Sequence, residues 1–589
     1  MKRSRAFRWL ALVIACAALG LGLVQAWRWY ALPARVEAVL PPQPEAGGWP
    51  REFRDRLQDG SARAASRGDA LGGVAELGRL YHANGFATEA EACWRFLRAE
   101  QPREARWAHL LADLHRAASD YEAMETQLRE VVRLDPEYSP AWLQWGNHAF
   151  KTGRFDEAAQ AFSRRLALAP GDPYARLGLA RLALQADRRL EARRMIESLV
   201  ADQPKFAPAQ NLLAELLAAE GDEAGAARHR NLGNLAIRYF EAEDPWLNEL
   251  TRWCYDVKRL RVLATIEFQI ERGDRGVALM ERAARLTPED PDGYAVLGDL
   301  FIKLDQPAPA REALERSLQL SGGRKPPVMV YVNLSHALRQ LKLPAEALRV
   351  VHQGQAVHPD AFELFDELGI VLGDLGRLDD AVAAFRAAIE RNPGDPNANF
   401  NLAVVLLGLQ RRAEAYRALE QSLTLKPTFP QSLSLLGRLE IEDGRMADAE
   451  KHLRLLYSSY PDVPEVRQML GQWELLTGRA AEARKDNAAA EGHYRAGIAL
   501  DPENVELHAS LGVLLLVGGR VDEAVAPLEV YRRLQPTNAQ AALFLGQAYA
   551  RLGRIAPARA TLAEGAELAE RAGNQATAEF CREILKQLR

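Results

Sequence analysis

The side chains that most often carry out chemistry are spread thinly along this sequence of 589 residues. Its eleven histidines form no HExxH pair, and His109 and His115 are six residues apart, so they would not face each other on a helix. The four cysteines show no CxxC or CxxCH spacing, which excludes the common zinc, thioredoxin-like and c-haem signatures. Phosphate-binding loops and GxSxG elbows are also missing from the sequence. The sequence therefore predicts no catalytic site, no cofactor and no metal, and we expect a protein that is not an enzyme.

One stretch, EDPWLNELTRWCYDV at residues 243–257, concentrates aromatic side chains. Asp244 followed by Pro245 is typical of a helix start, with Asp as the N-cap and Pro at the first helical position. On a helix that begins there, Trp246 and Trp253 share one face. Two interpretations stay open: the tryptophans pack onto neighbouring helices, or they form an exposed aromatic patch that binds a partner.

The elements that must position these residues follow a regular repeat. Prolines recur 34 residues apart in two series, at positions 102, 136, 170 and 204 and at 359, 393, 427 and 461. The clearest unit, residues 362–395, contains two apolar stripes on either side of a turn at Gly376. Each stripe has helical spacing, so each unit is expected to form two amphipathic helices. Gly369 and Ala381 lack bulk where these helices must approach, and Pro393 cannot continue a helix.

These residues resemble the tetratricopeptide repeat (TPR), which has Leu-Gly at repeat positions 7–8, Ala at 20, an aromatic residue at 24 and Pro at 32. The resemblance covers about fourteen units between residues 71 and 573. It implies an all-α fold, a right-handed α-solenoid superhelix of helix-turn-helix units whose stacked neighbours bury a continuous core.

The spacing of the repeats divides the chain into six predicted segments. They are a transmembrane signal-anchor (1–30), a spacer with one short helix (31–68), an N-terminal TPR array (69–230), an inserted helical segment (231–256), a C-terminal TPR array (257–573) and a capping helix (574–589). Between Pro461 and Pro502 the spacing exceeds one unit by seven residues, which we assign to a lengthened second helix. In the capping helix, Phe580, Ile584 and Leu588 are expected to face the stack.

The first thirty residues predict export from the cytoplasm. Basic residues precede a charge-free run of 19 residues from Trp9 to Trp27, which is just long enough to cross a membrane as a helix. The basic flank is expected to stay cytoplasmic, so the repeats would lie in the periplasm or another extracytoplasmic space. Two alternatives stay open: residues 24–26 fit a signal-peptidase site that would release the body, and residues 13–16 resemble a lipoprotein cleavage box.

The overall charge and the repeat surface favour protein partners. Lys plus Arg (75) nearly balances Asp plus Glu (79), so the chain lacks the basic field that nucleic-acid binding needs. The TPR resemblance implies that the first helices line a concave surface, chiefly at repeat positions 2, 5, 9, 12 and 13. In the central units these positions give the partner-binding candidates His336, Arg339, Glu363, Asp366, Asn397, Phe400 and Arg438. This mixture of polar residues of both signs suits an extended peptide or the edge of a folded partner.

Two functions follow as hypotheses. The first is a membrane-tethered scaffold that binds other proteins in an envelope-associated assembly through its concave face. The alternative is an accessory subunit of an export or biosynthetic complex that binds a polysaccharide or another substrate through aromatic patches such as Trp246 and Trp253.

Overall fold

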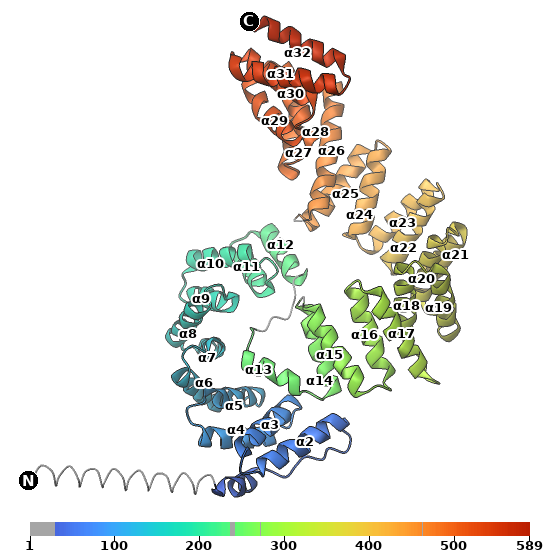
Figure 1. Ribbon diagram of the computed structural model, residues 1–589. Helices are drawn as coiled ribbons and strands as arrows, with labels where there is room; N and C mark the ends of the chain where they lie inside the picture. The colour runs from blue at the N-terminus through green and yellow to red at the C-terminus, as the bar shows by residue number, and fades with distance from the viewer. Residues whose placement is uncertain (1–29, 236–241, 271, 462, 589) are drawn as a thin grey trace, which may run out of the picture. The chain divides into compact units, whose positions relative to one another are not determined.

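The computed structural model describes residues 30–235, 242–270, 272–461 and 463–588. Within these ranges the regular elements are helices, without any strand (Figure 1). The predicted membrane-spanning run from Trp9 to Trp27 lies outside the described residues. In the part of the chain that the structure does describe, no helix combines the length and the apolar character needed to cross a membrane.

The chain forms two compact units, Met1–Leu343 and Pro344–Arg589. The helices of the first unit are α2 (Arg51–Ala64), α3 (Ala70–Ala83), α4 (Ala87–Glu100), α5 (Ala105–Ala117), α6 (Tyr121–Leu134), α7 (Ser139–Lys151), α8 (Phe155–Leu168), α9 (Pro173–Gln185), α10 (Arg189–Asp202), α11 (Ala207–Ala219), α12 (Glu223–Leu235), α13 (Pro245–Leu250), the 3₁₀ helix η1 (Thr251–Trp253), α14 (Val257–Gln269), α15 (Gly273–Leu286), α16 (Pro291–Lys303), α17 (Pro307–Ser321) and α18 (Val328–Gln340).

The second unit consists of the remaining helices and has its own buried clusters. These helices are α19 (Pro344–Val357), α20 (Phe362–Asp374), α21 (Leu378–Arg391), α22 (Pro396–Gly408), α23 (Arg412–Leu425), α24 (Pro430–Glu442), α25 (Met446–Ser459), α26 (Pro464–Ala483), α27 (Asn487–Leu500), α28 (Val505–Val517), α29 (Val521–Leu534), α30 (Ala539–Arg551), α31 (Ile555–Arg571) and α32 (Gln575–Gln587).

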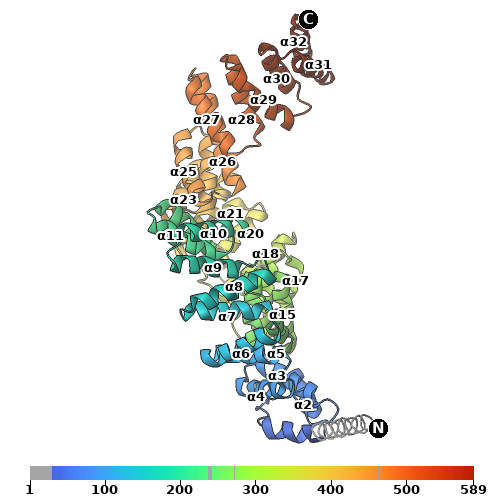
Figure 2. The ribbon, with the colours of Figure 1, turned by 90° about the vertical axis from the view of Figure 1, so that its left-hand side faces the viewer.

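The helices follow one another as antiparallel pairs of similar length. Within the described residues, the first unit contains seven such pairs, from α3/α4 to α16/α17, with α13 and η1 between the fifth and the sixth, and it ends with α18. The second unit begins with α19 and contains six pairs, from α20/α21 to α30/α31. In the first unit, helices α5 to α11 are stacked in chain order (Figure 2). The sequence prediction of an all-α solenoid of about fourteen helix-turn-helix units is therefore confirmed.

In several pairs the close approach of the two helices depends on a glycine, as the sequence predicted for Gly369. At Gly369 in α20, an added Cβ would lie 2.7 Å from the ring of Phe385 in α21. Gly146 faces Phe162 in the same way, also at 2.7 Å. The aromatic ring of the second helix thus fills the space that the missing side chain leaves, and this contact fixes the register of the pair.

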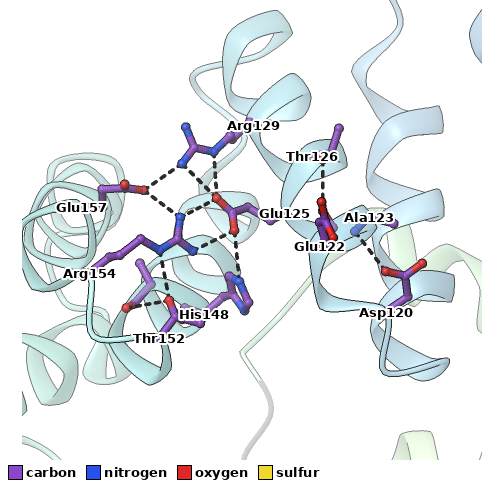
Figure 3. Close-up of polar contacts among 11 residues, drawn as sticks. Asp120, Glu122, Ala123, Glu125, Thr126, Arg129, His148, Thr152, Arg154 and Glu157 are labelled. Atoms are coloured by element: carbon purple, nitrogen blue, oxygen red, sulfur yellow. Dashed lines mark hydrogen bonds and ion pairs between the residues drawn. The ribbon is translucent and has the colours of Figure 1, made fainter.

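Adjacent pairs are also joined by ion pairs between α6 and the start of α8, shown in Figure 3. Both nitrogens of the Arg154 fork donate to the Glu125 carboxylate, at 2.5 and 2.8 Å, and Arg129 donates to the same group at 2.9 Å. Glu157 accepts a further bond from Arg129 at 3.1 Å. Chiefly because of the bonds from Arg154, the pKa of Glu125 is lowered to about 2.

The same arrangement of two glutamates and two arginines recurs in the second unit at corresponding repeat positions. Arg495 and Arg520 both contact Glu491, at 2.9 and 2.5 Å, and both contact Glu523. These bonds lower the pKa of Glu491 as well. The pattern therefore joins one repeat to the next at two separate places along the chain.

Residues 31–68 differ from the predicted spacer. Residues 30–39 are helical, and α2 extends over Arg51–Ala64 instead of the short stretch near residues 52–57. Phe53 and Leu57 of α2 are buried in one cluster with the first repeat, together with Leu32 and Val36. This apolar face covers the open end of the array, which a solenoid must protect from solvent.

The prediction of a lengthened second helix was wrong, and the prediction for the capping helix was wrong at one of its three residues. The seven extra residues belong to the first helix of their pair, because α26 has 20 residues whereas α27 has the usual 14. Gly478, near the C-terminal end of α26, is the glycine that faces Tyr494. In α32, Phe580 is 51% exposed, while Cys581 is fully buried against the last pair together with partly buried Ile584 and Leu588.

Candidate interaction surfaces

The insertion between α12 and α14 is a short docked helix. Residues 231–235 belong to α12 and residues 236–241 lie outside the described residues, so its described part is 242–256. As predicted, α13 begins at Pro245, and the Asp244 side chain caps it by accepting a bond from the Leu247 N–H at 3.3 Å. The helix ends after six residues and continues as η1. Residues 244–256 are called the docked segment below.

Asp244 is the centre of a buried polar cluster on the first repeats. Its carboxylate lies 2.6 Å from Nε2 of His109 in α5, accepts a bond from the Tyr138 hydroxyl and accepts another from the Gln144 amide at 3.2 Å. Asp244 is 6% exposed and His109 is fully buried. Burial and the neighbouring carboxylate raise the pKa of Tyr138, so this side chain stays a neutral hydroxyl that donates to Asp244.

Trp246 packs on the same cluster. Its ring stacks on Tyr138, with ring centroids 3.4 Å apart and planes 7° from parallel, and it meets the edge of His109 at 5.5 Å. The Trp246 N–H of the main chain donates to the Tyr138 hydroxyl at 3.2 Å. The guanidinium of Arg106 lies over the indole at 5.7 Å, a cation–π contact.

The other end of the docked segment is held by α2 and α3. Trp253 lies between the guanidinium groups of Arg56 and Arg79, at 5.2 and 5.9 Å. The side chain of Asn84 makes three hydrogen bonds to the main chain of the segment, donating to the Trp253 carbonyl and accepting from the N–H groups of residues 255 and 256. Both tryptophans are therefore half-buried against the N-terminal repeats.

The residues that hold the docked segment form what is called the receiving surface below: Arg79, Asn84, Arg106, His109 and Tyr138. The sequence did not predict this surface, because the repeat positions expected to line the concave face (2, 5, 9, 12 and 13) were assigned to residues only in the central units. The same positions in residues 71–138 include Arg79, Arg106 and His109, so extending that rule would have indicated part of it.

The second unit contains an apolar groove. It has a volume of about 1330 Å³ and is lined mainly by the first helices α22, α24 and α26. Its apolar wall includes Phe400, Val404 and Val463, of which Val404 is 46% and Val463 37% exposed. Arg438, Glu465 and Asp501 add charged groups to the lining. This surface is called the α22–α26 groove.

Two of the predicted candidates, Phe400 and Arg438, line the α22–α26 groove. Phe400 also meets the edge of Phe429, with ring centroids 6.2 Å apart. Asn397 is exposed at the start of α22, and its amide donates to Asp395 at 2.8 Å.

Glu363 and Asp366 lie on α20 and are half-buried. The Asn401 amide donates to Asp366 at 3.1 Å, but burial dominates and raises the pKa of Asp366 to about 6. His336 and Arg339 lie on α18 of the first unit, where burial, and then the charge of Arg339, lower the pKa of His336. The structure thus brings two of the seven central candidates into one groove; all of them stay predictions.

Comparisons with known proteins agree with the fold. Two family models, both described as tetratricopeptide repeat, match residues 149–216 and residues 109–173, 367–428, 405–464 and 475–539. These parts of the chain are tetratricopeptide repeats, which indicate a scaffold for protein–protein interactions and a non-catalytic role. The polysaccharide alternative gains no support, because Trp246 and Trp253 are engaged by the receiving surface.

Among curated proteins, the human protein O-mannosyl-transferase TMTC3 is 21% identical over 304 residues. The match covers 51% of this chain but only 29% of TMTC3, so the chain spans under a third of that relative.

Several solved structures are similar in fold at low identity. The APC/C hetero-tetramer Cut9–Hcn1 is 15% identical, with 84% of this chain and 98% of that chain covered and a TM-score of 0.29. The C-terminal part of a TPR repeat-containing protein from Cytophaga hutchinsonii is 14% identical, with 42% and 98% covered and a TM-score of 0.35. YrrB, a TPR protein with an unusual peptide-binding site, is 21% identical, with 30% and 90% covered and a TM-score of 0.25.

Proposed function

We propose that this protein is a membrane-tethered scaffold that holds another protein in an envelope-associated assembly, with the α22–α26 groove as its main contact surface. The observation that carries the proposal is the apolar lining of this groove. Val404 and Val463 expose much of their side chains there, next to Phe400. Solvent-exposed apolar side chains gathered in one concave surface mark an interaction site.

The charges in the lining suggest the chemistry of the partner. Glu442, Glu465 and Asp501 supply three carboxylates against the single guanidinium of Arg438, and Glu442 also pairs with Arg412 outside the lining. A protein segment with two or three apolar side chains and a neighbouring basic residue would therefore complement the groove. Apolar anchors would supply most of the affinity and the charges would set the orientation.

The N-terminal residues supply the proposed tether. The charge-free run from Trp9 to Trp27 is long enough for one membrane span, and its basic flank places the repeats outside the cytoplasm. Retention in the membrane after an alkaline carbonate wash, with digestion of the repeats by protease added to spheroplasts, would support this topology. Release into the wash or protection from protease would contradict it.

The partner surface can be tested with charge variants of the full-length chain in detergent. Val404→Glu combined with Val463→Glu places two carboxylates in the groove, at side chains exposed enough to accept them. The matched control, Ala383→Glu with Gln421→Glu, adds the same charge at exposed positions of the second helices α21 and α23. Proteins captured from native membranes by the wild-type chain and identified by mass spectrometry should be lost with the groove variant and kept with the control.

Equal capture by both variants would overturn the proposed groove. Loss with both would show that added negative charge, and not the groove, controls binding, and would overturn it as well. Circular dichroism of each variant confirms that the helical content is unchanged.

A further inference from the structure

Part of the first repeats is already covered by the chain's own docked segment, whose helix α13 lies on the inner side of the curve that α5 to α11 make in Figure 1. The hydrogen bonds between this segment and the N-terminal repeats connect residues that are 100 to 172 positions apart in the sequence, so they are not part of the local repeat packing. In a solenoid each repeat contacts only its neighbours, and this segment is an exception to that rule.

The contacts divide into two kinds, as in the recognition of a peptide. Asn84 grips main-chain groups of residues 253–256, so its three bonds do not depend on the side chains of the segment. His109 and Tyr138, in contrast, contact the side-chain carboxylate of Asp244, and the Tyr138 ring also stacks on Trp246. Main-chain bonds supply affinity, whereas side-chain pockets supply specificity.

The charges of the two sides are complementary. The receiving surface carries Arg79 and Arg106, and both contact the carboxylate of Glu249, at 3.4 and 3.3 Å. Asp244 adds a second carboxylate at the start of the segment. With the segment removed, the surface would present basic and aromatic groups to solvent, which fits an acidic segment that contains tryptophan.

The docked segment has little structure of its own. It consists of a six-residue α-helix and a three-residue 3₁₀ turn, and helices this short do not form alone in water. Its order therefore depends on the receiving surface and on the burial of Leu250, Cys254 and Tyr255 in one apolar cluster with α2, α3, α14 and α15. Its two tryptophans are only partly buried.

We propose that the receiving surface is a peptide-binding site that the docked segment blocks in the resting chain. Its second ligand is a segment of a partner protein with the same chemistry, an aspartate that caps a helix and a tryptophan two residues later. This site lies in the first unit and does not depend on the proposed role of the α22–α26 groove.

Binding of a labelled peptide tests the proposal. The peptide has the sequence of residues 242–256 with Cys254→Ser, and its anisotropy is measured against the full-length chain in detergent. Asp244→Asn with Trp246→Ala weakens the internal ligand but keeps the receiving surface. Because a tethered ligand competes at an effective concentration in the millimolar range, this variant should bind the peptide roughly tenfold or more tightly than the wild-type chain.

Two controls make the result specific. Adding His109→Ala to the variant should return binding to the wild-type level, because His109 contacts both Asp244 and Trp246. A peptide that lacks both the aspartate and the tryptophan should bind no better to the variant than to the wild-type chain. A variant that keeps its helical content but binds the peptide no more tightly than the wild-type chain overturns the proposal.

Hydrogen exchange on the unmodified chain decides the question if the variant does not fold. The Cys254→Ser substitution gives the peptide's fragments a different mass, so they are distinguished from those of the chain. Saturating peptide should speed exchange of the chain's own amides at 247–256 at least severalfold, while the α22 amides stay unchanged. Unchanged exchange at 247–256 overturns the proposal and shows that the docked segment is a permanent part of the fold.

Discussion

Replacing Gly369 by alanine tests how closely the two helices of a repeat approach. The added Cβ would lie 2.7 Å from Cε1 and Cζ of Phe385, whereas ordinary carbon contacts begin near 3.4 Å. Phe385 is 1% exposed, so its ring must move into a core that has no spare room. Overpacking of this kind costs about 1–3 kcal/mol. Alanine regains at most about 1 kcal/mol through its higher helix propensity.

Gly373→Ala in the same helix is the matched control. Its Cβ would meet only a methyl group of Val405, at 3.9 Å, which is an ordinary contact. Because the propensity gain applies to both positions, the difference between the variants isolates the overpacking, about 1–3 kcal/mol. Since 1.4 kcal/mol is a tenfold change, local opening should be roughly 5 to 150 times more frequent in Gly369→Ala.

Native-state hydrogen exchange of α20 and α21 measures this opening directly, which matters because repeat arrays do not unfold in one step. Gly437→Ala should show a smaller loss than Gly369→Ala, because the nearest atoms there belong to the side-chain end of Leu453, which can rotate. If Gly369→Ala opens no more often than Gly373→Ala, the ring of Phe385 has room to move, and the packing explanation of the repeat glycine is refuted.

Three further variants probe contacts at single residues. Asn84→Ala removes three bonds to the docked segment and should speed amide exchange at 247–256 by about tenfold or more, because a buried N–H left unsatisfied costs about 1–3 kcal/mol. The pKa of Glu125 is lowered to about 2, so its stabilisation is present above pH 4.5 and is lost as the pH falls towards 2. Glu125→Gln should remove about 1–2 kcal/mol at pH 7, after allowance for partial exposure, and flatten acid denaturation of α6–α8 as followed by exchange. Burial raises the pKa of Asp366 from 3.8 to about 6, so stability falls as the pH rises between these values. Asp366→Asn should stabilise α20–α22 by about 1–2 kcal/mol at pH 7 and remove that pH dependence in thermal unfolding.

The sequence predicts the repeat itself because the repeat is a local pattern. Gly369, Ala381 and Pro393 act within one 34-residue unit, so their spacing alone indicates two helices and a close contact between them. The start of α13 was predictable for the same reason, since Asp244 and Pro245 are neighbours.

Predictions failed where the sequence allowed two helix assignments and only contacts with another helix distinguished them. Helix α26 contains glycines at 471 and 478, and only the packing of Gly478 on Tyr494 shows that the first helix is the longer one. In α32, Ile584 and Leu588 pack on the last pair as predicted, but helical spacing allows either Phe580 or Cys581 beside them, and Cys581 is the buried residue. Large apolar residues at helical spacing therefore do not decide which face of a terminal helix is buried.

The receiving surface was hidden for a further reason. His109 and Asp244 are 135 residues apart, and each has an ordinary local role, one on a first helix and one as a helix cap. Nothing in their immediate neighbours marks them as a pair. Only the path of the array between them brings the carboxylate to the imidazole, and that path is set by small angles between many repeats.

The docked segment also changes how the first unit should respond to force or to a ligand. Without it, each of the first repeats would be stabilised only by its neighbours, and bending at one place would cost little elsewhere. The segment follows α12 in the chain but binds Asn84 and His109 of the first repeats. The repeats between His109 and α12 must therefore keep the curvature that brings the segment back to these residues. A ligand that changes this curvature should weaken docking of the segment, and a ligand that displaces the segment should make the curvature easier to change. The coupling free energy is the same in both directions, because coupling between two sites is reciprocal.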